Sequence, residues 1–208
     1  SLPSGKAPGL DGLPPQKGIR LHLGASVVRD VRGGCGKRLS SPCEALIVTV
    51  LKPGKISTSC DSYRPLSRSN TDNKILARLL ANRLHPLMAL IAQPDQSGFI
   101  KDRSTIWNLR TIFSALHTLR PDLPAAAMLL DATKAFDSLE WSFLFGLLKR
   151  IGFSPRFLAS IRLLYEQPVA RVWVNGVASG VFPVGRGTQQ GCPLSPLLYA
   201  IAMEPLAA

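Results

Sequence analysis

The sequence predicts an α+β protein, and three observations carry that prediction. Two long stretches place apolar residues at a spacing of three to four, which is typical of amphipathic helices. Several short apolar or alternating runs are bounded by glycine, proline or asparagine, which indicates strands. One alternating run turns back at an Asn-Gly pair, as β-hairpins do. Helices and a hairpin in this mixed order favour the α+β class.

The N-terminal fifth of the chain carries few of these signals. Residues 1–14, SLPSGKAPGLDGLP, are rich in glycine and proline and predict a loop. Residues 15–43 are basic and glycine-rich, without the period of a helix or a strand. A flexible loop is the simple interpretation, although an irregular run of this length is unusual inside a compact domain.

Regular structure is predicted for the middle of the chain. Residues 45–51 read as a strand that ends in a Pro-Gly turn. A helix is expected over 71–92, where Pro86 should introduce a kink or a break. A second amphipathic helix covers 104–119 and opens with a serine N-cap. The apolar run 125–131 then predicts a strand buried on both faces.

The last third alternates helices with the hairpin. A helix over 138–150 should end at Gly152, and a Ser-Pro pair caps the next helix, 155–166. The Asn-Gly turn at 175–176 predicts the hairpin. A glycine-rich loop leads into a final helix, LLYAIAMEPLAA. Because the sequence starts at Ser1 and stops inside this helical pattern, we expect a piece of something longer.

The charge of the chain bears on its partners. Lysine and arginine total 25 against 13 aspartate and glutamate, a formal net charge of +12. Basic side chains that displace counterions drive binding to phosphate backbones, so a polyanion is one interpretation. Solubility is the other. Aromatic residues are only 7% of the chain, so a base-stacking surface is not obvious.

Cysteine and histidine usage argues against a zinc site. The cysteines form no CxxC pair and no Cys/His spacing typical of zinc, so we interpret them as structural and the compartment as reducing. They are Cys35, Cys43, Cys60 and Cys192. No run approaches the roughly 20 apolar residues of a membrane helix, and no signal peptide is recognisable.

A carboxylate at the end of the apolar run is the first candidate for chemistry. A strand that ends in Asp131 would mount a carboxylate rigidly at a sheet edge. Mg²⁺ is held by such oxygens in phosphoryl transfer, and two ions about 4 Å apart stabilise the attacking and leaving oxygens. Asp131 as a cap of the following turn explains the segment equally well. The segment alone leaves both interpretations open.

The order of five motifs decides between these two interpretations of Asp131. The motifs are KAPGLDGLP, DSYRPLSRSNTDNKILARLLANRL, QPDQSGFIKDRS, LLDATKAFDSLEW and GTQQGCPLSPLLYAIAMEPLA. In this order they closely resemble the reverse transcriptase of LINE-type (non-LTR) retrotransposons. The resemblance covers residues 1–14 and about 44–208 and leaves out 15–43. It implies an RNA-directed DNA polymerase of the right-hand polymerase fold, working by two-metal nucleotidyl transfer.

The same resemblance divides the chain into two regions. Residues 1–124 would be the fingers-like region, and 125–208 a partial, ferredoxin-like palm. The family needs three acidic residues, two of them in a Tyr-x-Asp-Asp hairpin downstream of the last helix. This sequence ends before that hairpin, and Glu204 cannot replace it. The thumb and the endonuclease are absent as well. We therefore expect this chain by itself to be inactive as a polymerase.

The resemblance also assigns the catalytic centre. Asp131 would bind both catalytic metals, two Mg²⁺ ions with Mn²⁺ as a substitute, together with the backbone carbonyl of Ala132. Phe136 would pack beneath the sugar and exclude a ribose 2′-OH, a discrimination by pocket shape. Asp137 is not a metal ligand in the family and is expected to be structural.

Two binding sets follow from the resemblance. Nucleotide binding is assigned to Arg64, Lys52, Lys74, Phe136, Gln190 and Gly191. Template binding is assigned to Gln96, Gly98, Phe99, Arg103 and Ser195. A planar guanidinium such as that of Arg64 suits phosphate oxygens, and glycines let the backbone approach closely. A solvated turn for Lys52, a surface charge for Arg103 and a plain Gly-Pro turn for GCPLSP remain the competing interpretations.

The resemblance also implies binding partners, and the sequence departs from the family pattern at several positions. The resemblance implies an RNA template, a DNA primer or RNA–DNA hybrid and deoxynucleoside triphosphates, in nucleus and cytoplasm, with no membrane. The oligomeric state does not follow from the sequence. Arg68, Gln189 and the FIKDR segment depart from the family pattern. They favour a copy released from full activity, so a catalytically dead nucleic-acid-binding remnant and an unstable pseudogene product stay open.

Overall fold

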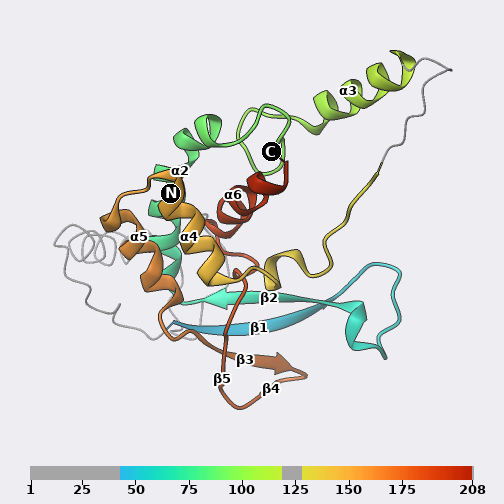
Figure 1. The fold of residues 1–208 in the computed structure, drawn as a ribbon. Coiled ribbons are helices and arrows are strands. Elements are labelled where there is room, and N and C mark those ends of the chain that lie inside the picture. Colours follow the sequence, from blue (N-terminus) through green and yellow to red (C-terminus); the bar gives the residue numbers. More distant parts are fainter. Residues whose placement is uncertain (1–42, 119–127, 208) are drawn as a thin grey trace.

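The computed structural model describes residues 43–118 and 128–207 (Figure 1). The first of the five motifs and nearly all of the irregular 15–43 segment lie outside the described residues. So do the first three residues of the predicted strand 125–131. Within the described parts the chain is a mixed α+β structure, as the sequence predicts.

One five-stranded sheet joins two distant parts of the chain. Its strands are β1 (Glu44–Leu51), β2 (Tyr63–Ser69), β3 (Val169–Val174), β4 (Val177–Ala178) and β5 (Phe182–Pro183). The order is β2-β1-β3-β4, and β5 also pairs with β3. β1 runs antiparallel to β2 and parallel to β3, so that Ala45 lies opposite both Ser69 and Ala170. The parallel pair therefore brings together strands that the sequence separates by more than half of the chain.

Two hairpins shape the sheet, and both contain predicted features. The strand predicted at 45–51 is β1, and a short 3₁₀ turn, η1 (Cys60–Ser62), leads from its far end into β2. The Asn-Gly hairpin is confirmed between β3 and β4, with φ of 50° at Asn175 and 83° at Gly176. Positive φ at both central residues is what a tight hairpin turn of this handedness requires.

The helices agree with the sequence prediction to within a few residues. They are α2 (Thr71–Ile91), α3 (Thr105–Thr118), α4 (Trp141–Ile151), α5 (Pro155–Arg162) and α6 (Ser195–Ala207), with 3₁₀ turns η2 (Ala135–Asp137) and η3 (Leu163–Tyr165). Gly152 ends α4 with φ of 100°. The Ser154 hydroxyl accepts a hydrogen bond from the Phe157 N–H at 3.3 Å and caps α5. These caps satisfy backbone groups that a helix end would otherwise leave without partners.

The break predicted at Pro86 is wrong. α2 continues through Pro86 to Ile91 without interruption. Proline removes the hydrogen bond to the carbonyl four residues earlier, here that of Asn82. Pro86 and Asn82 are both exposed, so water can take over at that carbonyl. The buried side of the same helix, which includes Leu84 and Met88, holds it to the core.

The core lies where α2, α4, α5 and α6 meet. Eight of its side chains have no exposure at all: Leu84, Met88, Leu144, Leu148, Ile161, Leu194, Leu198 and Ile201. These four helices lie above one end of the sheet (Figure 1). We call the four helices, the sheet and the loops between them the body.

A second region, the arm, does not pack in this way. It consists of α3 and the described residues 128–131, and α3 extends away from the body in Figure 1. α3 has no buried residue. The predicted buried strand is wrong for residues 128–131, because they form no strand, and Met128, Leu129 and Leu130 are 83%, 94% and 77% exposed. An apolar run becomes a buried strand only beside partner strands, and none of the described strands pairs with it.

Candidate functional site

The loop before α6 is fastened to the turn around η2, and this junction joins two of the five motifs. The Gly187 N–H donates to the Leu139 carbonyl at 2.7 Å, and the Thr188 N–H donates to the Phe136 carbonyl at 2.7 Å. The Trp141 indole N–H donates to the Gly187 carbonyl at 2.8 Å. Three hydrogen bonds thus fix segments that lie about fifty residues apart in sequence.

Glycine is the one residue type that fits at position 187 of this junction. Its φ is +85°, a left-handed conformation that side chains rarely adopt. A Cβ atom built there would lie 2.9 Å from the Cα and carbonyl oxygen of Asp137 and 2.9 Å from the Phe136 carbonyl oxygen. Because these neighbours are backbone atoms, no side-chain rotation could relieve the overlap.

Phe136 stands between two other aromatic side chains. Its ring lies 4.9 Å from that of Tyr199 on α6, centroid to centroid, and 6.0 Å from that of Phe99. The Phe99 contact is edge-to-face, with planes at 73°, an arrangement favoured by the ring quadrupoles. The structure therefore brings together the predicted residues Phe99 and Phe136. Tyr199 was missed by the sequence analysis, because nothing local in its helical motif marks it as the partner of Phe136.

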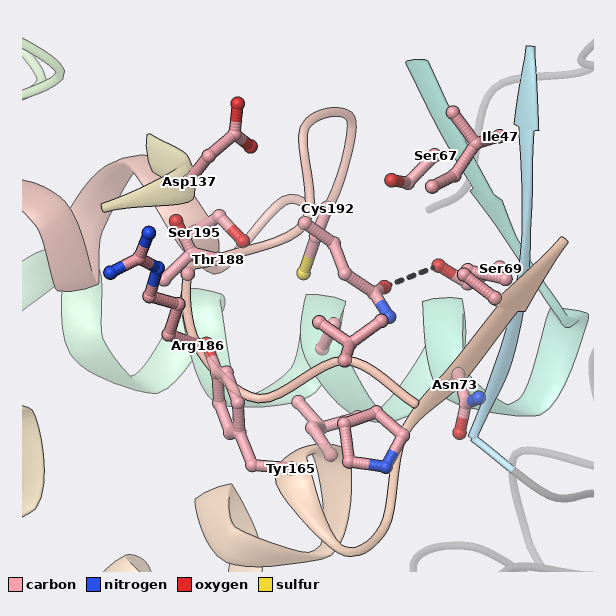
Figure 2. A pocket seen from close by; sticks show the side chains of 18 of the residues that line it. Ile47, Ser67, Ser69, Asn73, Asp137, Tyr165, Arg186, Thr188, Cys192 and Ser195 are labelled. Carbon is pink, nitrogen blue, oxygen red and sulfur yellow. Dashed lines mark hydrogen bonds between the residues drawn. The ribbon is translucent and has the colours of Figure 1, made fainter. Parts of the chain in front are cut away.

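Gln189 and Gln190 are tied to β2. The Ser67 N–H donates to the Gln190 carbonyl at 3.0 Å. The Ser69 hydroxyl donates to Gln189 Oε1 at 2.8 Å, the dashed line at Ser69 in Figure 2. Gly191 has φ of +100°, and a Cβ there would lie 3.2 Å from the Ser67 carbonyl oxygen. The glycine-rich loop therefore runs along the strand that also carries Arg64.

The segment between α2 and α3 is organised by Arg103. Its guanidinium donates to three backbone carbonyls, those of Ala92 (3.2 Å), Gln93 and Gln96 (2.8 Å). Such a fork of donors on main-chain oxygens fixes the path of the loop. A contact of Arg103 with template remains a prediction, while its role in holding this loop is what the geometry provides.

The rest of the QSGF segment is held locally. The Gln96 side-chain oxygen accepts from the Gly98 N–H at 3.0 Å, and Phe99 has φ of 61° and is 52% exposed. Glu204 on α6 is buried and accepts from the Gln93 N–H at 3.0 Å. The sequence analysis considered Glu204 only as a substitute metal ligand. Its structural role depends on a hydrogen bond to a residue 111 positions away in sequence, and no local pattern reveals such a contact.

The predicted phosphate-binding cations lie on β2, in the turn after β1 and on α2. Arg64 is exposed on β2, opposite Val50 of β1. The Lys52 ammonium donates to the Asp61 carbonyl at 2.7 Å, so it helps to close the turn between β1 and β2. Lys74 is half-buried in the first turns of α2 and lines a cavity together with Ser195.

That cavity has a volume of about 110 Å³ and lies between the sheet, α2 and the loop that precedes α6 (Figure 2). Tyr165 forms part of its wall and packs edge-on against Trp141 and Phe145, with centroids 5.5 Å and 5.9 Å away. Burial raises the pKa of the Tyr165 phenol above its ordinary value, and the nearby Cys192 adds to the rise. The phenol therefore stays neutral at physiological pH.

Asp131 belongs to the arm and not to this junction. Its side chain and that of Ala132 are exposed. Across residues 43–118 and 128–207, no group of three or more histidine, cysteine, aspartate or glutamate side chains could hold a metal ion. One exposed carboxylate does not fit the carboxylate set that a pair of Mg²⁺ ions needs. The described residues thus hold no complete carboxylate set for such a site.

The order of the motifs resembles that of reverse transcriptases, and comparison with known proteins agrees. The family model described as reverse transcriptase (RNA-dependent DNA polymerase) matches residues 50–208. The chain therefore belongs to the reverse transcriptase family. Its relatives narrow the class to non-LTR retrotransposons, as the motif resemblance predicts.

Three relatives illustrate this. The chain is 32% identical over 208 residues to the transposon TX1 uncharacterized 149 kDa protein of Xenopus laevis, which covers 98% of the chain. It is 34% identical over 211 residues to the RNA-directed DNA polymerase from mobile element jockey of Drosophila melanogaster. It is 27% identical over 202 residues to the Pol polyprotein from the type-2 retrotransposable element R2DM of the same fly. In each of these two matches, 96% of the chain is covered.

The chain spans only a small part of these relatives. It corresponds to 16% of the TX1 protein, 22% of the jockey polymerase and 19% of the R2DM polyprotein. Among the residues that the structure describes, no helix is both long enough and apolar enough to cross a membrane.

Proposed function

We propose that this chain is the part of a non-LTR reverse transcriptase that shapes the nucleotide and template sites. The parent protein would copy element RNA into DNA from a DNA primer, using deoxynucleoside triphosphates. The observation that carries this proposal is the junction at Gly187. It places Phe136 beside the loop of Gln190 and Gly191 through hydrogen bonds that only a glycine permits.

Within this proposal the residues have distinct roles. Phe136, held between Phe99 and Tyr199, would lie beneath the sugar and reject a 2′-OH. Gln190 and Gly191 would contact the incoming nucleotide, and Arg64 its phosphates. Lys52 and Lys74 would add positive charge nearby.

Template binding is proposed for Gln96, Gly98, Phe99, Arg103 and Ser195. The exposed Phe99 ring could stack on a base, whereas Arg103 would act by keeping the loop in place.

The architecture proposed for the parent is the right-hand polymerase fold. Residues 1–124 would belong to the fingers and 125–208 to a ferredoxin-like palm. The parallel pairing of β1 with β3 would then tie the two regions together. Nucleus and cytoplasm are the proposed locations, since the parent would meet both genomic DNA and its own RNA.

Metal-dependent chemistry is proposed for the parent and not for this chain alone. In the parent, Mg²⁺ would supply charge stabilisation for nucleotidyl transfer, with Asp131 and the Ala132 carbonyl as two of its ligands. Among the described residues, no group of three or more acidic, histidine or cysteine side chains completes that set. We therefore propose that the 208-residue chain binds nucleic acid without extending a primer.

Primer extension tests the first half of this proposal. The purified chain is given an RNA template, a DNA primer, deoxynucleotides and Mg²⁺ or Mn²⁺, and no extension is expected. Template-dependent extension that Asp131→Asn abolishes would show a working metal site and overturn the proposal of inactivity.

Binding to an RNA–DNA hybrid tests the second half. Affinity should fall steeply between low and moderate salt, because phosphate contacts release counterions. Arg64→Ala should reduce the salt slope by about 1 and weaken binding several-fold. Arg150→Ala is the matched control, since Arg150 is exposed at the end of α4 and outside every motif. Equal losses for the two variants would mean that charge alone, without a defined site, explains the binding.

A further inference from the structure

The cavity beneath the glycine-rich loop is only partly accounted for by the proposed polymerase site, to which Lys74 and Ser195 of its wall were assigned. Gly187, Thr188 and Gln189 line it, whereas Phe136, Gln190, Gly191 and Arg64 do not. It therefore lies behind the loop, between the sheet and the body helices (Figure 2).

Small side chains on the sheet create this space. Ser69 of β2, Ala45 of β1 and Ala170 of β3 lie opposite one another in the strand register. Residues directly opposite on paired strands share one face of a sheet, so the three form a row. All three are buried and line the cavity. A row of larger side chains would have filled the volume between the sheet and α2.

Two buried polar side chains on the cavity wall have atoms without a partner. Asn73 on α2 is 5% exposed, and its Oδ1 makes no hydrogen bond. Ser195 at the start of α6 is 2% exposed, and its Oγ makes none either. A buried polar atom without a partner costs free energy, so each favours an occupant that supplies one.

The remaining wall selects an apolar occupant. Ile47, Leu164, Val184 and the Tyr165 ring line the cavity beside the small residues. A cavity of about 150 Å³ lined by apolar side chains is known to bind benzene. A volume of about 110 Å³ is of the same order and suits one ring.

We infer that this cavity is a binding site for one small, uncharged ring that carries an O–H or N–H donor. The Asn73 Oδ1 atom can only accept, so it requires the donor. The Ser195 hydroxyl can either donate or accept, so it restricts the polar group of the ligand less than Asn73 does. Three charged side chains also line the cavity, but Arg186 and Asp137 are exposed and Lys74 already has another partner. A charged ring is therefore disfavoured, because burying a charge without a partner costs far more than burying a hydroxyl.

Such a ligand would act on the loop. It would contact Thr188, Gln189 and Cys192. The Gln189 side chain also accepts a hydrogen bond from Ser69 on β2. Occupancy would therefore stabilise the arrangement in which the loop lies along β2. This inference does not depend on polymerase activity, and a chain that never binds nucleic acid could still hold the ligand.

Phenol and toluene provide the direct test on the 208-residue chain. They have nearly the same shape, and only phenol has a donor. Phenol should bind saturably with a Kd on the order of 1 mM, and toluene roughly threefold to tenfold more weakly. At tenfold excess over its Kd, phenol should raise Tm by about 4 °C. Two-dimensional NMR should show shifts at Thr188, Gln189 and Cys192.

A blocking variant and a matched control localise the site. Ala170→Leu fills the floor and should abolish phenol binding, while Ala89→Leu, on the exposed side of α2, should leave it unchanged. Asn73→Leu removes the acceptor with little change in volume and should reduce the preference for phenol over toluene. It also serves if Ala170→Leu fails to fold.

The inference fails if phenol produces no saturable shift, or binds no better than toluene. It also fails if phenol binds Ala170→Leu as tightly as the unchanged chain. Those results would leave water as the partner of the Asn73 Oδ1 and Ser195 Oγ atoms.

Discussion

The body and the arm have similar amphipathic sequences and opposite environments. In α2 the apolar side buries Leu76, Leu80, Leu84 and Met88 to 1% exposure or less. In α3 the apolar residues recur at the same spacing, yet Trp107 and Phe113 are 63% and 54% exposed. α3 spans 14 residues, so its length does not explain the difference. The difference lies in the partners, since α4, α5 and α6 cover α2, and no described element covers α3.

This difference separates the parts of the candidate site. The Gly187 junction, Phe136 and the loop along β2 belong to the body and are fixed by hydrogen bonds and ring contacts. Asp131 belongs to the arm, where it is exposed and lies outside any helix or strand. The parts proposed to bind nucleotide are therefore fixed by those hydrogen bonds and ring contacts, while the carboxylate proposed for the metals is not. Catalysis needs its groups held in a productive geometry, so the arm would limit activity before the body does.

The comparison is tested most strongly by truncating one leucine in each region. Leu144→Ala, in α4, should lower the free energy of unfolding by about 4 kcal/mol, because it leaves a cavity in a fully buried site. Leu109→Ala, in α3, should lower it by less than about 0.5 kcal/mol, since Leu109 is 52% exposed. Urea unfolding followed by circular dichroism measures both. Similar losses would mean that α3 is packed in solution and that the arm is not a separate region.

The junction itself is tested by Gly187→Ala. A Cβ there must overlap backbone atoms of Phe136 and Asp137, and the φ is strained for any side chain. The free energy of unfolding should therefore fall by about 3 kcal/mol. Gly185→Ala is the matched control, because a Cβ at Gly185 meets nothing within 4 Å. Urea midpoints of the two variants give the comparison. If Gly187→Ala behaves like the control, the loop and the η2 turn are not in contact.

The smallest expected effect concerns Tyr165, which joins the body helices to the cavity wall. Its pKa is raised by burial, so the folded state holds the phenol proton more tightly than the unfolded state does. That contribution is complete below the unfolded pKa of about 10 and is lost as pH rises above it. Between pH 10 and pH 11 the unchanged chain should lose about 1 kcal/mol more stability than Tyr165→Phe. Parallel pH profiles would place Tyr165 in contact with water.

Particular residues show how far sequence reasoning reached. The Asn175-Gly176 turn, the Gly152 and Ser154 caps and strand β1 were predictable, because each follows from local backbone preferences. Residues 128–131 were not, since the same apolar run suits a buried strand or an exposed segment that lacks partners. The break expected at Pro86 does not occur, because Pro86 lies on the exposed side of α2, where water can replace the lost hydrogen bond.

The candidate site shows the same division. The motifs in which they stand predict Phe136, Phe99, Gln190 and Gly191 as site residues, and the structure brings Phe136 and Phe99 into contact. Tyr199 and Glu204 were not, because a ring contact and a hydrogen bond across more than sixty residues leave no local pattern. Arg103 was identified by its motif, but its backbone partners could be read only from the structure.

By itself the sequence determined the family, the α+β class and most helix and strand positions. These depend on interactions between near neighbours, or on motif order, and both are written along the chain. Only the tertiary structure decided which amphipathic helix is covered, that Gly187 has backbone atoms on its Cβ side, and that Ser69, Ala45 and Ala170 form one row above a cavity. Those facts arise where strands and loops far apart in sequence meet, because packing depends on distance in space and not on distance along the chain.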